Sequence, residues 1–372
     1  MRLPSTHRRT AKTPVDVMYV GSGSTAGLRR ADTEMLSALR GLGVGVLEVT
    51  PKLEPPRPTR RYVQRSLATI DAFESMALRR ATAGALSSHE PRAIIYSTTH
   101  AAMLQPRAAE RARVAIRFDT PARLSRSGAP YRLEHALERR RFERAALLMP
   151  SALELGPDTT RLLPPQVPVV PVPIPIELSG EPAAANRDPV AVFYAASPEK
   201  KGLDIAVRAW ARVARADARG RRLVITGIDR ERGLRYLHKQ GIAEPPAVQW
   251  TGLLSPERHR ALTRRAEVYL AASRYENYGI GQLEALADGS MLVTTPSPGP
   301  FAALPIAREL DAQMVAAGDS PAALAAALET AFARGEDERV SYRAHARERL
   351  RAFSHEETSK RLRDAVLPLL LS

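Results

Sequence analysis

A chain of 372 residues is long enough for two domains of ordinary size, and its 44% hydrophobic and 26% charged residues are typical of a globular protein. It contains no cysteine, which excludes disulfides, thiolate nucleophiles and cysteine metal sites. The sequence has no apolar run of about 18 residues, and no apolar core follows its basic N-terminus. We therefore expect neither a membrane span nor a secretory signal peptide.

Positive charge is concentrated in the first half of the chain. Residues 1–175 hold 27 Lys+Arg and 15 Asp+Glu, a net charge of +12, whereas the remainder holds 28 and 25, a net charge of +3. Such a basic half predicts an anionic partner, which is a membrane surface, a nucleic acid or an acidic acceptor. Because aromatic residues are only 5% and no recognition motif is present, we do not expect nucleic acid.

The first half alternates between strand-like and helix-like segments. Strands are expected at 15–20, 45–49, 93–96, 114–118 and 146–149, with helices at 28–39, 66–80 and 131–145. This alternation predicts a parallel, doubly wound sheet. The Pro-rich stretch 164–189 cannot be helical, so we expect a short strand there and an interdomain linker at 171–189.

The second half repeats the alternation. Strands are expected at 190–194, 222–226, 248–250, 268–272 and 291–294, and helices at 202–214, 229–240, 256–265, 280–288, 320–333 and 355–370. We predict an α/β protein with two Rossmann-like, doubly wound domains, at 1–170 and 190–354, facing a cleft. The final segment, 355–372, is expected to be a helix that crosses back to the first domain.

The strongest functional signal lies in residues 275–284, which read Tyr-Glu-Asn-Tyr-Gly-Ile-Gly-Gln-Leu-Glu. Glu276 and Glu284 bracket two glycines at the expected start of a helix. Gly-rich backbone at a helix start presents N–H groups that attract phosphate, and carboxylates accept hydrogen bonds from sugar and ribose hydroxyls. The pattern therefore indicates a site for a sugar nucleotide.

A second signal is the Lys-Lys-Gly sequence at 200–202. Lys200 and Lys201 are two of only six lysines, and they lie where a strand is expected to end and a helix to begin. A lysine at that position neutralises a diphosphate as it leaves.

Together these motifs resemble the retaining nucleotide-sugar glycosyltransferases of the GT-B fold, in particular family four. The order is strand, Lys-Lys-Gly, helix, strand ending in Gly227, Trp-Thr-Gly252, and then Glu-x7-Glu. The resemblance covers residues 190–300 and extends to the rest by layout. It implies transfer of a sugar from a UDP- or GDP-type donor with retention, with no cofactor. Dependence on metal is not indicated, because the histidines do not cluster and no Asp-x-Asp is present.

The resemblance also implies roles for individual residues. Glu276 would bond the hydroxyls of the donor sugar and stabilise charge at the anomeric carbon, Glu284 would bond the ribose hydroxyls, and Lys201, with Lys200 beside it, would meet the diphosphate. Asp119 stands near the place where the family often has a histidine that contacts the sugar. Further donor contacts are expected from Tyr278, Gly279, Ile280, Gly227, Thr251 and Leu253.

One position departs from the family pattern. Members usually carry an arginine five residues before the motif lysine, where this chain has Ala196. Arg274 and Lys200 are candidates to replace it. The departure also leaves open a degenerate protein that binds a sugar nucleotide without turning it over.

The loop from Gly21 to Ala26 supports a different class. It reads Gly-Ser-Gly-Ser-Thr-Ala after an expected strand, which satisfies a dinucleotide fingerprint and favours an NAD(P)-dependent oxidoreductase. In the resembling family the same loop, with Gly21, Gly23 and Ser24, approaches the acceptor or the donor phosphate. His100 is a further candidate beside the cleft.

Two expected helices, at 60–80 and 131–144, are rich in arginine. Each is either an ordinary amphipathic helix packed on the sheet or an interfacial helix on a membrane. We expect a cytoplasmic protein that is a candidate for peripheral attachment to the inner face of the cell membrane, with a lipid-linked or anionic acceptor.

Overall fold

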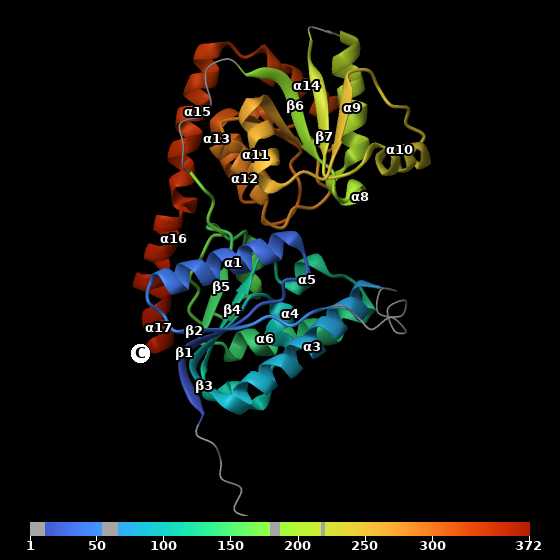
Figure 1. Cartoon of the computed structure of the whole chain (residues 1–372). Coiled ribbons are helices and arrows are strands. Elements are labelled where there is room, and N and C mark those ends of the chain that lie inside the picture. The colour runs from blue at the N-terminus through green and yellow to red at the C-terminus, as the bar shows by residue number, and fades with distance from the viewer. Residues whose placement is uncertain (1–11, 54–65, 179–186, 217–219) are drawn as a thin grey trace, which may run out of the picture. The chain divides into compact units, whose positions relative to one another are not determined.

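The computed structural model describes residues 12–53, 66–178, 187–216 and 220–372. These form two compact units, each built on a parallel five-stranded sheet with helices around it (Figure 1). The first unit takes the described residues up to Pro175 together with Glu356–Ser372, and the second takes Ile176–His355. The predicted α/β class with two Rossmann-like domains is confirmed.

The first sheet has the strand order β2-β1-β3-β4-β5. From β1 the chain moves to one side to form β2 and then to the other side to form β3, so the winding reverses between β1 and β3. Ligands of such sheets bind at the carboxyl ends of the strands where this reversal occurs. The strands are β1 Thr13–Val20, β2 Val46–Val49, β3 His89–Tyr96, β4 Arg113–Phe118 and β5 Leu147–Pro150.

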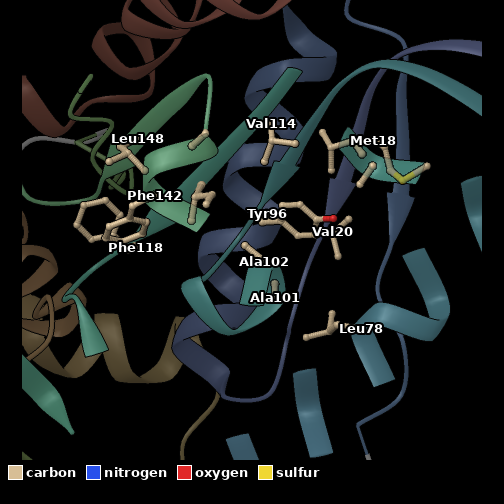
Figure 2. Close-up of a cluster of buried hydrophobic side chains, with 14 of the residues drawn as sticks. Met18, Val20, Leu78, Tyr96, Ala101, Ala102, Val114, Phe118, Phe142 and Leu148 are labelled. Atoms are coloured by element: carbon tan, nitrogen blue, oxygen red, sulfur yellow. The ribbon is translucent and has the colours of Figure 1, made fainter. Parts of the chain in front are cut away.

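Successive side chains of each strand point to opposite faces of the sheet. Because both faces are apolar here, helices cover both of them. On one face, Phe118 and Phe142 pack with ring centroids 5.2 Å apart in a cluster that includes Met18 and Tyr96 (Figure 2). A capping box between Ser66 and Thr69 begins the long helix α3. The helices are α1 Ala26–Gly41, α3 Leu67–Ser88, α4 Thr99–Met103, α5 Ala122–Ser125, α6 Arg132–Arg144 and α7 Pro157–Leu162.

The C-terminal segment completes the opposite face of the first sheet. It runs through α16 His355–Arg361, a π-helical turn at Leu362–Val366 and α17 Leu367–Leu371. Its buried residues recur every four positions, which places them on one side of a helix. They are Leu362, Val366 and Leu370, and they share a core cluster with Val17 and Tyr19 of β1.

The second sheet has the strand order β10-β9-β6-β7-β8, so its winding reverses between β6 and β9. The loops that follow these two strands therefore occupy the position where a ligand is expected. The strands are β6 Asp188–Tyr194, β7 Arg222–Thr226, β8 Val248–Gly252, β9 Ala266–Ala271 and β10 Met291–Thr294.

Three helices of the second unit, the short α8 and the longer α13 and α15, were not predicted from the sequence. In α15 the buried residues Tyr342, Ala346 and Leu350 form a stripe one residue wide in a strongly charged segment, which is too little to stand out as apolar periodicity. The helices are α8 Pro198–Lys201, α9 Leu203–Ala216, α10 Arg230–Lys239, α11 Pro256–Arg265, α12 Ile280–Ala287, α13 Ala303–Asp311, α14 Pro321–Ala333 and α15 Glu336–Leu350.

The Pro-rich stretch follows β5 in the first unit. Val169 forms an isolated parallel bridge with Leu148, and the Val172 N–H donates to the Pro150 carbonyl at 2.8 Å. Residues 179–186 of the expected linker, and residues 60–65 of the first expected basic helix, lie outside the described residues. Among the described helices, none combines the length and apolar character that crossing a bilayer requires.

Truncating Leu362 tests whether the C-terminal segment stabilises the first unit. Leu362→Ala removes a fully buried side chain, so we expect the free energy of unfolding of the first unit to fall by about 3 kcal/mol. Hydrogen exchange should accelerate at β1 amides and stay unchanged at β6 and β7. Leu237→Ala, an equally buried leucine of the second unit, should give the reverse pattern; the same pattern in both variants would contradict the assignment.

Candidate active site

Glu276 is the centre of the site at the carboxyl edge of the second sheet. Its side chain is buried, and its Oε2 atom accepts hydrogen bonds from three donors. Lys201 Nζ, at the end of α8 in the connection after β6 (called the β6 loop), lies at 2.6 Å, and Ser273 Oγ, directly after β9, lies at 2.9 Å. Gln282 Nε2, in the first turn of α12, lies at 3.1 Å. The carboxylate therefore joins the β6 loop, the β9 loop and α12.

Opposing effects act on the ionisation of Glu276. Burial by itself raises the pKa of its carboxyl group, but the positive charge of Lys201 and the hydrogen bonds from Lys201, Ser273 and Gln282 outweigh burial and lower the pKa below its usual value. Glu276 is therefore ionised at neutral pH, although it is enclosed by protein. A fixed negative charge and a fixed positive charge thus lie side by side where the winding of the sheet reverses.

Gly202 determines where Lys201 can lie. Its φ angle of 69° is in the left-handed region, and a Cβ atom built there would be 2.0 Å from the carbonyl oxygen of Ala272, at the end of β9. Only glycine permits this approach between the α8–α9 junction and β9. The Lys-Gly pair of the sequence is thereby explained as a backbone requirement next to the cation.

Gly279 is the N-cap residue of α12. It has a φ angle of 89°, and a Cβ atom there would lie 2.7 Å from the ring of Phe301. Glycine has no side chain with which to cap the helix, and the first N–H groups of a helix, here at Ile280 and Gly281, have no partner within it. Combined with the helix dipole, this end of α12 is suited to a phosphate group.

Glu284 lies one turn further along α12 than Ile280. It shares an environment with Glu276, since burial and then the charges of Glu276 and Glu284 raise the pKa of the Tyr269 hydroxyl on β9. Both carboxylates of the Glu-x7-Glu motif are therefore near one buried tyrosine of the sheet.

The ends of β7 and β8 complete this edge. The Gly227 N–H donates to the Gly252 carbonyl at 2.8 Å, and the Thr251 hydroxyl donates to the same carbonyl at 3.1 Å. Gly227 has a φ angle of 82°, and a Cβ atom there would lie 2.7 Å from the Tyr194 ring. Leu253 follows with a side chain that is 80% exposed.

Arg274 is not poised to replace the arginine missing at Ala196. Its guanidinium donates to Asp204 Oδ2 at 2.7 Å and to the Glu199 carbonyl at 2.6 Å, which ties the β9 loop to α8 and α9. Lys200, the other candidate, has an exposed side chain at the end of α8. Arg274 is therefore already engaged by protein groups, whereas the roles of Lys200 and Lys201 at the diphosphate stay predictions.

In the first unit, protein groups take hydrogen bonds from the glycine loop after β1. The Ser22 N–H donates to Ser97 Oγ at 3.0 Å, and the Gly23 N–H donates to Asp32 Oδ2 at 3.2 Å. The Tyr19 hydroxyl donates to the other oxygen of Asp32 at 2.7 Å. A dinucleotide diphosphate would need these amides and would meet a carboxylate beside them, so the arrangement disfavours the oxidoreductase.

Two further predicted residues lie in the first unit. Asp119 is half-buried in the loop after β4. Burial lowers the pKa of the Arg117 guanidinium, but Tyr19, Asp32 and, after them, Asp119 outweigh burial and raise it. Ser24 lies in the glycine loop and hydrogen-bonds Glu74 of α3. Gly21, Gly23, Ser24 and Asp119 thus belong to a unit other than that of Glu276.

His100 lies in a polar cluster at the start of α4. Its Nε2 atom is 3.1 Å from Glu134 Oε1 and 3.5 Å from Asp71 Oδ2, and Arg126 Nε is 3.0 Å from the same Asp71 oxygen. Burial lowers the pKa of His100, but the two carboxylates raise it to about 9. Three potential metal ligands meet here, Asp71, His100 and Glu134, yet a protonated histidine and Arg126 already compensate the carboxylates.

Sequence reasoning missed Ser273 and Gln282 as partners of Glu276. Gln282 does lie within the recognised motif, but the sequence does not show that its amide points back to Glu276. Within the second unit the structure places Lys201, Glu276, Tyr278, Gly279, Ile280 and Glu284 around the β6 and β9 loops, and Gly227, Thr251 and Leu253 at the neighbouring strand ends.

Residues 188–334, most of the second unit, match the protein family described as Glycosyl transferases group 1. No curated protein matches the chain by sequence. The match covers less than half of the chain, so it describes a similarity of the second unit and not of the whole protein.

Solved structures share the fold of the whole chain. A sucrose-phosphate synthase from Thermosynechococcus elongatus has a TM-score of 0.70 at 14% identity, with 96% of this chain and 99% of that chain covered. HepE from Anabaena, in complex with UDP and glucose, has a TM-score of 0.64 at 14% identity, with 95% of this chain and 99% of that chain covered. An α,α-trehalose 6-phosphate synthase from Burkholderia multivorans has a TM-score of 0.65 at 13% identity, with 96% of this chain and 98% of that chain covered. These likenesses show that the chain shares the fold of these three proteins.

A methyl group at Gly202 should disrupt the placement of Lys201. In Gly202→Ala both the left-handed φ angle and the contact with the Ala272 carbonyl oppose alanine, so we expect a loss of at least about 3 kcal/mol in the free energy of unfolding. Gly241→Ala, with a φ angle of 65° and open space around the new methyl group, should lose only about 1–2 kcal/mol. Equal losses in denaturant titrations would contradict the close-contact argument.

Removing the cation at Lys201 should make stability depend on pH in a defined direction. The lowered pKa of Glu276 stabilises the wild type above the ordinary glutamate pKa, and that contribution is lost as pH falls through the folded-state value. In Lys201→Met, burial without the cation raises this pKa, so ionisation at neutral pH opposes folding. The variant should be about 3 kcal/mol less stable than wild type at pH 7.

The difference between wild type and Lys201→Met should shrink as the pH falls below about 4, because Glu276 becomes protonated in both proteins. Lys201→Met/Glu276→Gln should recover part of the loss at pH 7, which a double-mutant cycle measures. Lys239→Met, at an exposed lysine of α10, serves as the control. A stability difference that does not vary with pH would contradict the proposed pairing.

Proposed function

We propose that this protein is a glycosyltransferase that moves a sugar from a nucleoside-diphosphate donor to an acceptor, with retention at the anomeric carbon. The observation that carries the proposal is the 2.6 Å pair between Lys201 Nζ and Glu276 Oε2, at the point where the winding of the second sheet reverses. A cation and a carboxylate held together there match the two parts of a sugar diphosphate, which are an anionic leaving group and a hydroxyl-rich ring.

Each part of the donor would be held by a different element of the second unit. The diphosphate lies at the N-terminus of α12, against the N–H groups of Ile280 and Gly281 and near Lys201. The sugar hydroxyls bond to Glu276, and the ribose hydroxyls bond to Glu284, one turn beyond the start of the helix. Thr251 and Leu253, after β8, lie near the base, together with main-chain groups.

The transition state would resemble an oxocarbenium ion, so a buried ionised carboxylate near the anomeric carbon stabilises it. Glu276 accepts hydrogen bonds from three protein donors through one oxygen, which suits a positioning and electrostatic role better than nucleophilic attack. We therefore favour front-face transfer in which the leaving phosphate takes the acceptor proton. Lys201 supplies the charge that meets the departing diphosphate, and on this ground we propose that neither a metal ion nor a cofactor takes part.

For the donor we propose a UDP-type sugar first and a GDP-type sugar second. HepE from Anabaena, which shares the fold, has been solved in complex with UDP-glucose. For the acceptor we propose a lipid-linked molecule reached at the carboxyl edge of the first sheet, with the protein placed peripherally on the inner face of the cell membrane. The excess of arginine in the first half of the chain supports such a location.

Ala196 supports one competing function. A protein without the usual arginine could bind a sugar nucleotide and not transfer its sugar, in which case ligand binding would occur without turnover. Lys201 and Glu276 would serve both functions, because they would bind the donor in either case, so turnover is the observation that separates the enzyme from the binding module.

Ligand-induced stabilisation tests the donor site. A ligand at about 100 times its dissociation constant contributes about 2.7 kcal/mol, which for one domain of this size corresponds to a rise in Tm of roughly 5 °C or more. We expect UDP or GDP to give this rise, Glu284→Gln to remove most of it, and Glu329→Gln, at an exposed glutamate of α14, to leave it unchanged. Stabilisation by NAD or NADP alone would overturn the proposal.

Stereochemistry tests the mechanism. Slow hydrolysis of the matching α-linked nucleotide sugar, followed by NMR, should release the α-anomer first, and Glu276→Gln should lower the rate by at least 100-fold because a transition-state charge loses its partner. Initial release of the β-anomer would contradict retention. Strong donor binding without any turnover would support the binding module.

A further inference from the structure

Three leucines of the first unit are exposed at the starts of helices. Leu67 begins α3, Leu124 lies in α5 and Leu133 is the second residue of α6, with 55%, 39% and 71% of their surfaces exposed. Helix starts in a parallel α/β unit lie at the carboxyl edge of the sheet, because each helix follows the end of a strand or runs back toward the start of the next. All three leucines therefore lie at that edge of the first unit.

Hydrogen bonds join the three helix starts around Arg126. Arg126 Nε donates to Asp71 Oδ2 at 3.0 Å, which links the residue after α5 to the second turn of α3. His135 Nε2 donates to the Arg126 carbonyl at 3.0 Å, which links the same residue to the first turn of α6. Leu67, Leu124 and Leu133 each lie within four residues of one of these partners, about one helical turn. We call these three leucines the leucine cluster.

On α3, α5 and α6 most acidic side chains are buried or half-buried, and most arginine side chains are exposed. Asp71, Glu134 and Glu138 are buried, where they meet His100, Arg126 and the Ala122 N–H. Within these three helices, all fully described, Glu143 is the one acid with an exposed side chain, and it pairs with Arg139 at 2.9 Å. The exposed arginines are Arg123 and Arg132, next in sequence to Leu124 and Leu133, and Arg79, Arg80, Arg139, Arg140 and Arg144, further along α3 and α6.

We infer that this face, formed by the leucine cluster with the exposed Arg123 and Arg132 beside it, docks on a bilayer that contains anionic lipid. Large apolar side chains exposed among arginines are unfavourable in water and favourable at the boundary between lipid headgroups and acyl chains. The arginines complement the negative surface of such a bilayer. The phosphates of a nucleic acid would also complement the arginines, but a nucleic acid would not bury three exposed leucines.

The position of the face gives docking a role. The glycine loop after β1 and His100, after β3, lie at the same carboxyl edge as the three helix starts. A lipid-linked acceptor held in the bilayer would therefore arrive at the edge where this kind of sheet binds ligands. This role rests on the proposed function, whereas the docking itself does not depend on which donor or acceptor is used.

Vesicle flotation of the full chain tests the inference without any use of its chemistry. Vesicles of phosphatidylcholine with 30% phosphatidylglycerol should bind the wild type at 0.15 M salt, and vesicles of pure phosphatidylcholine should bind it at least tenfold more weakly. Leu67→Ser/Leu124→Ser/Leu133→Ser should weaken binding to the anionic vesicles by at least tenfold. Arg123→Ser and Arg132→Ser should each weaken it about fivefold.

Matched controls lie on the second unit. Val340→Ser, at a residue of α15 that is 51% exposed, and Arg212→Ser, at an exposed residue of α9, should leave vesicle binding unchanged. The thermal response of every variant to UDP or GDP reports on the donor site separately. Equal binding of the leucine variant and the wild type to anionic vesicles would overturn the inference. So would a second result, in which vesicles bind neither protein and both proteins bind a DNA duplex equally well.

Discussion

The short ion pair between Lys201 and Glu276 is the interaction on which the site of the second unit depends. Ionised carboxylates are costly to enclose, and Glu276 is ionised because Lys201, Ser273 and Gln282 all donate to it. These donors come from the β6 loop, the β9 loop and α12, so one carboxylate fixes three elements at the sheet edge. Gly202 permits the approach of the first loop to β9, since no other residue fits against the Ala272 carbonyl.

Both units use the same topology, but they differ in what lies at the point where the winding reverses. In the second unit a lysine and a glycine-led helix start are placed there, and both favour an anionic ligand. In the first unit Ser97 and Asp32 take the loop amides of Ser22 and Gly23, and the His100 cluster balances its own charges. The excess of arginine in the first unit is instead carried on the outside of its helices. The proposed nucleotide site and the proposed surface for an anionic partner thus lie in different units, as expected if one unit binds the donor and the other serves the acceptor.

The sequence predicts the ten strands well because buried parallel strands are short apolar runs between glycine and proline signals. It fails for α15, whose buried stripe of Tyr342, Ala346 and Leu350 is hidden among charges. Motif spacing identifies Glu276 and Lys201, and the structure shows how close they are. Contacts between residues distant in sequence could not be foreseen, such as Asp32 on the Gly23 amide or Asp204 on Arg274. For that reason the glycine loop looked like a dinucleotide site, and Arg274 looked available for the diphosphate.

The most direct test of the central claim is calorimetric binding of a nucleoside diphosphate, compared with its nucleoside, to wild type and Lys201→Met at pH 7. If Lys201 meets the diphosphate, the variant should bind UDP, or GDP if that is the stabilising ligand, at least tenfold more weakly, a loss of about 1.4 kcal/mol, while its affinity for uridine or guanosine stays the same. Equal affinity of the two proteins for the diphosphate would contradict the account, because the Lys201–Glu276 pair would then have a structural role alone.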